Sequence, residues 1–214
     1  MAIQYSRLPR RFAPRNDTHS TKTMKKLLFI IFLILFSNSV FFANSDSFFT
    51  TEISLGTGIS IYDSGAGDFR KSLLNKSDFR RIILGITTDT NLNISDPLKI
   101  MFGAETFCDF LWAGSDYFNT FDYAFFTGIK VFPTRTGFNF SISYVLGNRT
   151  DYFDEAPKQD TKAWGNGFRI SLQYDFMEEK EYKIKPHAGA YYRCIPRGNY
   201  NTDHILCLYG GIRF

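Results

Sequence analysis

Apolar and polar residues alternate along eight separate stretches of this 214-residue sequence, and the last stretch ends at Phe214. In the first stretch, odd-numbered positions hold Ile53, Leu55, Ile59 and Ile61, and most of the residues between them are small or polar. A period of two is that of a β-strand with one apolar and one polar face. Because a closed barrel leaves no unpaired strand edge in lipid, the sequence predicts an all-β fold, an eight-stranded antiparallel up-and-down transmembrane β-barrel.

Short and long breaks separate the stretches in alternation. The predicted strands cover residues 49–62, 79–94, 99–112, 117–132, 138–146, 168–176, 182–193 and 204–214. Short turns follow the second, fourth and sixth strands, and four longer loops follow the odd-numbered ones. Both ends of the barrel chain are therefore expected in the periplasm, with the loops facing outward. Pro186 cannot donate to a ladder, so the seventh strand is expected to carry a local defect or to begin its pairing after this residue.

A soluble or periplasmic β-sandwich is the alternative fold, because its strands alternate as well. The exposed face of a sandwich would be mostly polar. Here large apolar residues recur on one face throughout, while the other face carries Gly, Ser, Thr and single charges, as a narrow lumen requires. The pattern therefore favours the membrane barrel.

Residues 24–43 have the features of a secretory signal peptide. Lys25 and Lys26 precede an apolar run over residues 27–36, and small residues follow it. The run is shorter than the roughly 20 residues of a spanning helix, although a retained inner-membrane anchor is the alternative. Residues 1–23 are interpreted as a start assigned too early or as a basic extension. The predicted barrel domain is therefore residues 44–214.

The net charge of +4 comes from this amino-terminal part. Residues 1–43 contain seven of the 25 basic and one of the 21 acidic residues, which leaves 18 basic and 20 acidic residues in the predicted barrel. A mildly acidic barrel domain lacks the basic surface that nucleic-acid binding needs, so nucleic acid is not an expected partner.

The same alternation turns twelve charged side chains toward the lumen. Six are acidic and six are basic: Glu52, Arg81, Asp89, Glu105, Asp109, Asp122, Lys130, Arg169, Asp175, Lys185, Arg193 and Arg213. Eight strands leave an interior that side chains just fill, so equal numbers of opposite charges predict a salt-bridge plug. The alternative is a gate or selectivity filter, with the candidates Arg81, Asp109, Asp122, Arg169, Arg193, Glu52, Glu105 and Lys130.

The closing run Leu206–Phe214, with alternate apolar residues and a final Phe214, resembles the carboxyl-terminal targeting signal that the barrel-assembly machinery reads. In size and strand count the chain is similar to the small barrels typified by outer-membrane proteins A, X and W. Its Phe- and Tyr-rich strands and its leader resemble a treponemal (spirochaete) relative of outer-membrane protein W. That resemblance implies a narrow, largely hydrophobic lumen that passes small apolar molecules sideways into the membrane, and the twelve charges depart from it.

Other groups of reactive side chains carry little chemistry. The third loop holds the acidic residues Asp151, Asp154, Glu155 and Asp160 without the spacing of a calcium loop, so no metal and no cofactor is predicted. His187 and His204 lack an apparent Ser and Asp partner, so no enzyme activity is predicted. Cys108, Cys194 and Cys207 are odd in number, and alternation places Cys194 and Cys207 on opposite faces, which predicts reduced thiols.

Two predicted loops, 63–77 and 147–165, mix aromatic and charged residues. This composition suits contact with a partner, although any exposed loop shows it. The surface candidates are Tyr152, Asp154 and Trp164. The predicted function is a narrow, porin-like channel for small apolar or polar solutes, and the alternative is a non-conducting barrel that serves structure or adhesion to a host ligand. Outer-membrane lipid and the barrel-assembly machinery are the expected partners.

Overall fold

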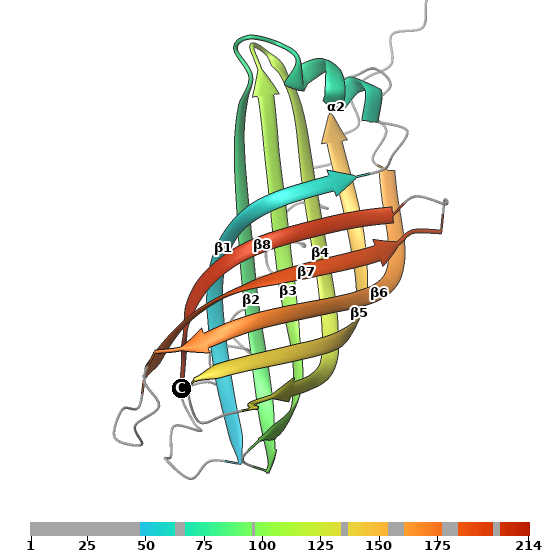
Figure 1. Ribbon diagram of the computed structural model, residues 1–214. Helices are drawn as coiled ribbons and strands as arrows, with labels where there is room; N and C mark the ends of the chain where they lie inside the picture. Colours follow the sequence, from blue (N-terminus) through green and yellow to red (C-terminus); the bar gives the residue numbers. More distant parts are fainter. Residues whose placement is uncertain are drawn as a thin grey trace, which may run out of the picture. The chain divides into compact units, whose positions relative to one another are not determined.

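Eight antiparallel strands close into one barrel in the order β1 to β8, as the alternation predicts (Figure 1). Each strand pairs with its neighbours in sequence, and β8 closes the ring against β1. The strands span Phe49–Tyr62 (β1), Arg80–Ser95 (β2), Leu98–Ala113 (β3), Asp116–Val131 (β4), Phe138–Phe153 (β5), Thr161–Asp175 (β6), Lys185–Pro196 (β7) and Thr202–Arg213 (β8). The predicted fold class is therefore confirmed.

This computed structural model describes residues 48–62, 67–95, 97–133, 137–153, 161–176, 184–198 and 202–214. All of them belong to one compact unit, Phe42–Phe214. The predicted signal peptide and the segment before it lie outside the described residues. In the described part of the chain, no helix combines the length and the apolar character that a membrane crossing needs.

Alternate side chains point outward and inward, as the pleat of a strand requires. The outward set is apolar and exposed, with Ile61, Phe125 and Leu208 among its most exposed members. The inward set is buried and largely polar or charged. An apolar outer face and a polar interior are the reverse of what a soluble protein shows, and they suit a barrel surrounded by lipid.

The fifth and sixth strands are longer than predicted, and the predicted loop 147–165 is wrong at both of its ends. Residues 147–153 continue β5, and residues 161–165 belong to β6, with backbone partners such as Gly147 and Gly165. The second outer loop is also shorter than expected, because Ala113 pairs with Asp116 across a two-residue turn. Gly114 in this turn has a φ of 62°, a backbone conformation that Gly adopts without steric cost.

A short helix, α2 (Gly67–Leu74), replaces part of the predicted loop 63–77. Leu73 of α2 is fully buried against Leu111, Ala113 and Phe118, at the outer ends of β3 and β4. These three side chains belong to the inward set, so α2 packs on the inner side of the wall that β3 and β4 form. The sequence has no long apolar period here, which is why the helix escaped prediction.

The strand ends near Phe214 lie at the end of the barrel that holds the turns after β2, β4 and β6, and we refer to it as the periplasmic end. Pro186 lies there. Pro186 pairs with Ile212 of β8, so the ladder between β7 and β8 is not interrupted there. The pairing between β7 and β6 begins only at His187, so the interruption that Pro186 predicted is found on the β6 side alone. The carbonyl oxygen of Pro186 still accepts a hydrogen bond from the Phe176 amide, 3.0 Å away.

Candidate functional site

The lumen holds the charged side chains that the alternation pointed inward. Ten of the twelve are buried, and Arg81 and Lys185 are partly exposed. The structure therefore places all eight gate candidates on the inner side of the barrel, where they join three clusters of ion pairs along the barrel. Their role as a gate stays a prediction.

The central cluster joins opposite walls of the barrel through Arg193 of β7. Arg193 contacts Glu105 of β3 at 2.6 Å and Asp122 of β4 at 2.6 Å. Arg169 of β6 approaches Glu105 at 3.4 Å. The Arg169 guanidinium lies over the rings of Phe126 and Tyr191, 4.7 and 4.4 Å from their centroids, a cation–π arrangement that suits a desolvated site. These charges and their partners come from four different strands, β3, β4, β6 and β7.

The central cluster continues toward the outer end through residues that the sequence analysis assigned to loops. Arg197 contacts Asp122 at 2.9 Å and Asp203 at 2.6 Å, and Arg149 pairs with both Asp203 and Asp151. All are buried. The sequence signal that was missed is the alternation of β5: its odd-numbered residues face inward, and this continues from Val145 through Arg149.

A second cluster fills the periplasmic end of the lumen. Lys130 contacts Glu52 at 2.9 Å and Asp89 at 3.8 Å, and Arg213 contacts Asp175 at 2.6 Å. Neutral side chains tie these pairs together. Asn91 and Gln173 donate hydrogen bonds to the acids, at distances of 2.8 to 3.3 Å. A buried charge cluster of this kind is stable only because nearly every group has a partner.

The third cluster lies at the outer end, beneath α2. Asp109 of β3 accepts hydrogen bonds from Arg81 of β2 at 2.7 and 2.8 Å and from Arg70 of α2 at 3.0 Å. Ser60 donates to the same carboxylate at 2.7 Å. Arg70 and Arg149 also lie over the Tyr62 ring, 5.4 and 4.9 Å from its centroid. The helix is thus tied to the lumen by both an apolar and a charged contact.

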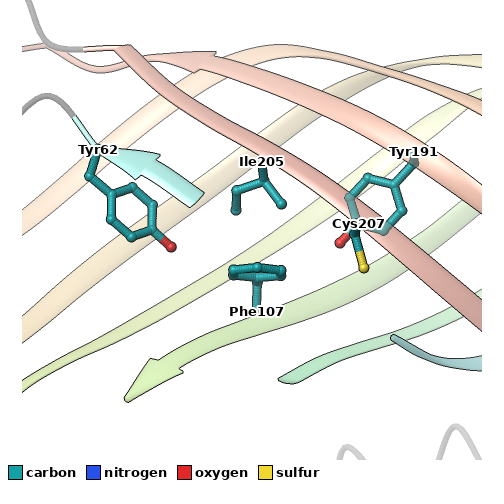
Figure 2. Close-up of a cluster of buried hydrophobic side chains, with 5 residues drawn as sticks. All are labelled: Tyr62, Phe107, Tyr191, Ile205 and Cys207. Atoms are coloured by element: carbon teal, nitrogen blue, oxygen red, sulfur yellow. The ribbon is translucent and has the colours of Figure 1, made fainter. Parts of the chain in front are cut away.

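Apolar side chains occupy the lumen between these clusters. Figure 2 shows one group, in which Phe107 and Ile205 lie between Tyr62 and Tyr191, beside Cys207. The rings and the ion pairs together come from strands all around the barrel, so side chains of both kinds fill its interior. This agrees with the small interior expected for eight strands.

The remaining candidates form no complete site within the part of the chain that the structure describes. Asp151 pairs with Arg149 and accepts a hydrogen bond from Thr120, while Asp154, Glu155 and Asp160 lie outside the described residues. The described part of the chain has no group of three His, Cys, Asp or Glu side chains arranged to hold a metal. His187 contacts Ser54 at 2.8 Å, but its Nδ1 has no hydrogen-bond partner among the described residues, so the acid that orients a catalytic His is missing from that pair.

Three further predictions concern cysteines and surface residues. Cys108, Cys194 and Cys207 are free, as predicted, and Cys207 is buried in the lumen. Tyr152 lies in β5 with its ring 5.7 Å from that of Phe121, and the exposed Trp164 lies in β6, 6.4 Å from the Tyr123 ring. Neither belongs to a loop, and Asp154 lies outside the described residues.

No protein-family model matches the chain, and no curated protein matches it. Several solved structures have a similar fold. Ail, the attachment invasion locus protein of Yersinia pestis, has a TM-score of 0.54 and 11% sequence identity, with 77% of this chain and 98% of that chain covered. Ail in complex with the heparin analogue sucrose octasulfate has a TM-score of 0.51 and 10% identity, with 78% and 99% covered. Neisserial surface protein A has a TM-score of 0.47 and 13% identity, with 78% and 96% covered.

The likeness to the two Ail structures shows the fold alone. Together with the closed ladder, the apolar outer face and the charged lumen, it identifies the chain as a small eight-stranded β-barrel of the outer membrane.

Proposed function

We propose that the protein is a closed outer-membrane barrel that acts through its outer end as a surface attachment protein, rather than as an open conduit. The observation that carries the proposal is the bridge from Arg193 to Glu105 and Asp122, which joins β7 to β3 and β4 across the lumen. These side chains are at most 1% exposed. Because eight strands leave an interior that side chains just fill, such a bridge obstructs the path of a solute.

The outer end offers a surface for a ligand. Helix α2 lies there with its exposed Lys71, and exposed Lys76 just beyond it pairs with Asp116 at 2.6 Å, so this surface presents two lysines to a ligand. Ail, which has a similar fold, has been solved in complex with the heparin analogue sucrose octasulfate. A sulfated glycan is therefore the first probe to use on this chain.

Conductance in planar bilayers tests the closed state. Protein extracted from the outer membrane should give no discrete openings, because the plug is intact. Arg169→Ala, which removes one cation from the central cluster, should also stay closed or should show rare openings, whereas heat-unfolded protein serves as the control for leakage. Regular openings of the unaltered, folded protein would contradict the proposal.

A narrow channel for small solutes, as predicted from the sequence, is the second candidate. Glu105 and Asp122 each serve two guanidinium groups, so ion pairs can exchange partners without leaving a carboxylate alone. This sharing favours a gate that opens transiently. Under this candidate, openings would occur in the unaltered protein, and Arg169→Ala would change their conductance or frequency.

Binding to an immobilised sulfated glycan tests the attachment role. Exchange of both Lys71 and Lys76 for Glu should reduce binding, while exchange of Lys99 for Glu at the periplasmic end should have no effect. Equal binding by all three proteins would contradict a role of this basic surface. Recognition by the barrel-assembly machinery stays a prediction supported by the terminal Phe214, and a relation to outer-membrane protein W stays a prediction supported by size, strand count, the Phe- and Tyr-rich strands and the leader.

A further inference from the structure

The barrel wall has a seam between β1 and β2. Their pairing ends at Gly56 and Gly85, yet β1 continues to Tyr62 beside β8, and β2 reaches Arg80 beside β3. Figure 1 shows β1 bending away from β2 and following β8 toward the outer end. We define the β1–β2 seam as residues 57–62 of β1 and 80–84 of β2, among which no backbone pairing joins the two strands.

Side chains hold the seam together where the ladder has ended. Thr57 Oγ1 donates a hydrogen bond to the carbonyl oxygen of Ile83 at 3.0 Å, and Arg81 Nη2 donates to Ser60 Oγ at 2.9 Å. An interrupted ladder beside lipid is costly unless polar groups meet its backbone. The seam therefore needs polar partners at the membrane surface.

The lipid-facing side of the seam is apolar. Ile59 and Ile61 on β1 and Ile82 and Leu84 on β2 are all exposed on the outer face of the barrel. The outer face of the seam is thus continuous with the apolar, lipid-facing surface of the barrel. A molecule that fits it must present an apolar part to these side chains.

The inner side of the seam carries an excess of positive charge. Arg70 and Arg81 share one carboxylate, that of Asp109, at 3.0 and 2.7 Å. The two arginine side chains are 12% and 21% exposed, unlike the central arginines of the lumen. Arg70 Nε is buried without a hydrogen-bond partner among the described residues. Exposed Lys71 adjoins Arg70 in the sequence, and exposed Arg80 lies on the outer face together with Ile82 and Leu84, so both add positive charge near the seam.

We propose that the β1–β2 seam binds the phosphate headgroup of an anionic phospholipid, with Arg81 and Arg70 on the phosphate and an acyl chain along the apolar side. A guanidinium group binds phosphate oxygens with two parallel hydrogen bonds. Two arginines that share a single carboxylate carry one positive charge more than the acid neutralises, which suits a phosphate. A lipid is preferred to soluble phosphate because the seam is continuous with the lipid-facing surface. The inference goes beyond the proposed function and does not depend on it.

The two tryptophans of the chain allow a direct test. Trp112 of β3 pairs with Arg80 next to the seam, whereas Trp164 lies on β6, away from it. The full chain, with either Trp164→Phe or Trp112→Phe, is reconstituted in phosphatidylcholine vesicles that contain a minor fraction of phosphatidylglycerol. One of the two lipids carries bromine on its acyl chains, which quenches nearby tryptophan.

Brominated phosphatidylglycerol should quench Trp112 more strongly than brominated phosphatidylcholine does at the same fraction, and Trp164 should not distinguish them. One basic residue near a membrane surface strengthens binding of anionic lipid about fivefold. Arg81→Gln should therefore reduce the preference for phosphatidylglycerol several-fold. Arg81→Lys should retain most of it, and Lys99→Gln should leave it unchanged. Circular dichroism confirms that each variant is folded.

Three results would overturn the proposal. One is equal quenching of Trp112 by both brominated lipids in the Trp164→Phe chain. Another is a preference that Arg81→Gln and a second variant, Arg70→Gln, both leave intact. Loss of the preference on addition of inorganic phosphate at constant ionic strength would also contradict it, since the site would then take the free anion.

Discussion

Arg193 Nη2 lies 2.6 Å from Asp122 Oδ2, and this contact joins β7 to β4 through the middle of the barrel. Both side chains are at most 1% exposed. Around them the central cluster balances four arginines with four acids: Arg149, Arg169, Arg193 and Arg197 against Glu105, Asp122, Asp151 and Asp203. Removal of one member therefore leaves an opposite charge buried without its full complement.

Arg193→Ala should lower the free energy of unfolding by about 3–5 kcal/mol, the usual cost of removing one partner of a buried ion pair. Unfolding by urea in detergent, followed by tryptophan fluorescence, measures it. The matched control is Lys76→Ala, because Lys76 forms an ion pair with Asp116 in which both side chains are exposed. That loss should be at most about 1 kcal/mol. Equal losses for the two variants would mean that breaking this buried ion pair costs no more than breaking an exposed one.

Gly58→Ala should destabilise the barrel, because an added Cβ would overlap the Leu206 carbonyl oxygen of the neighbouring strand. A backbone atom cannot rotate away as a side chain can, so the closure between β1 and β8 would have to shift. We expect a loss of about 1–3 kcal/mol, as for other overpacked sites. Gly198→Ala is the control, since no atom of the described residues lies within 4 Å of the position that its Cβ would take. The same urea transition compares them, and an unchanged midpoint for Gly58→Ala would refute the close packing.

The alternation alone predicted the barrel, the strand order and the inward set, because every side chain of a strand faces one of only two sides. The limits of the strands were predicted less well. Polar outward residues such as Asn148 and Thr150 made the outer ends of β5 and β6 resemble a loop, yet Asn148 is buried between its cross-strand neighbours Tyr123 and Trp164. A polar residue near the outer end of the barrel can still belong to a strand, so the alternation of inward and outward residues marks the strand limits there better than polarity does.

The partners within the lumen could not be predicted from the sequence. Arg193 and Asp122 are 71 residues apart, and which acid meets which arginine depends on the register and curvature of eight strands. Arg70 was missed for a different reason, since its position depends on α2, a helix of only eight residues. So short a helix is stable through packing of residues such as Leu73 rather than through its own propensity.

Thiol labelling should separate the three cysteines by their environment. Cys207 is 1% exposed within the lumen, so a water-soluble maleimide should not label it in the folded protein. Cys108 and Cys194 are partly exposed and belong to the outward set, so a membrane-permeant maleimide should reach them while the protein is folded. Denaturation should make all three reactive without a reductant. A count below three after denaturation would show a disulfide and contradict the free thiols.

Leu73→Ala should release α2 from the barrel while the strands stay folded. Leu73 is fully buried against Leu111, Ala113 and Phe118, and truncation of such a side chain costs about 2–5 kcal/mol. This loss falls on the contact between α2 and the wall, because the barrel ladder does not include the helix. Hydrogen exchange measured by mass spectrometry should therefore show faster exchange in residues 67–74 and unchanged exchange in β3 and β4. The exposed Lys71 provides the control, since Lys71→Ala should alter exchange in neither region. Unchanged exchange of α2 in Leu73→Ala would show that other contacts, such as that of Arg70 with Asp109, hold the helix in place.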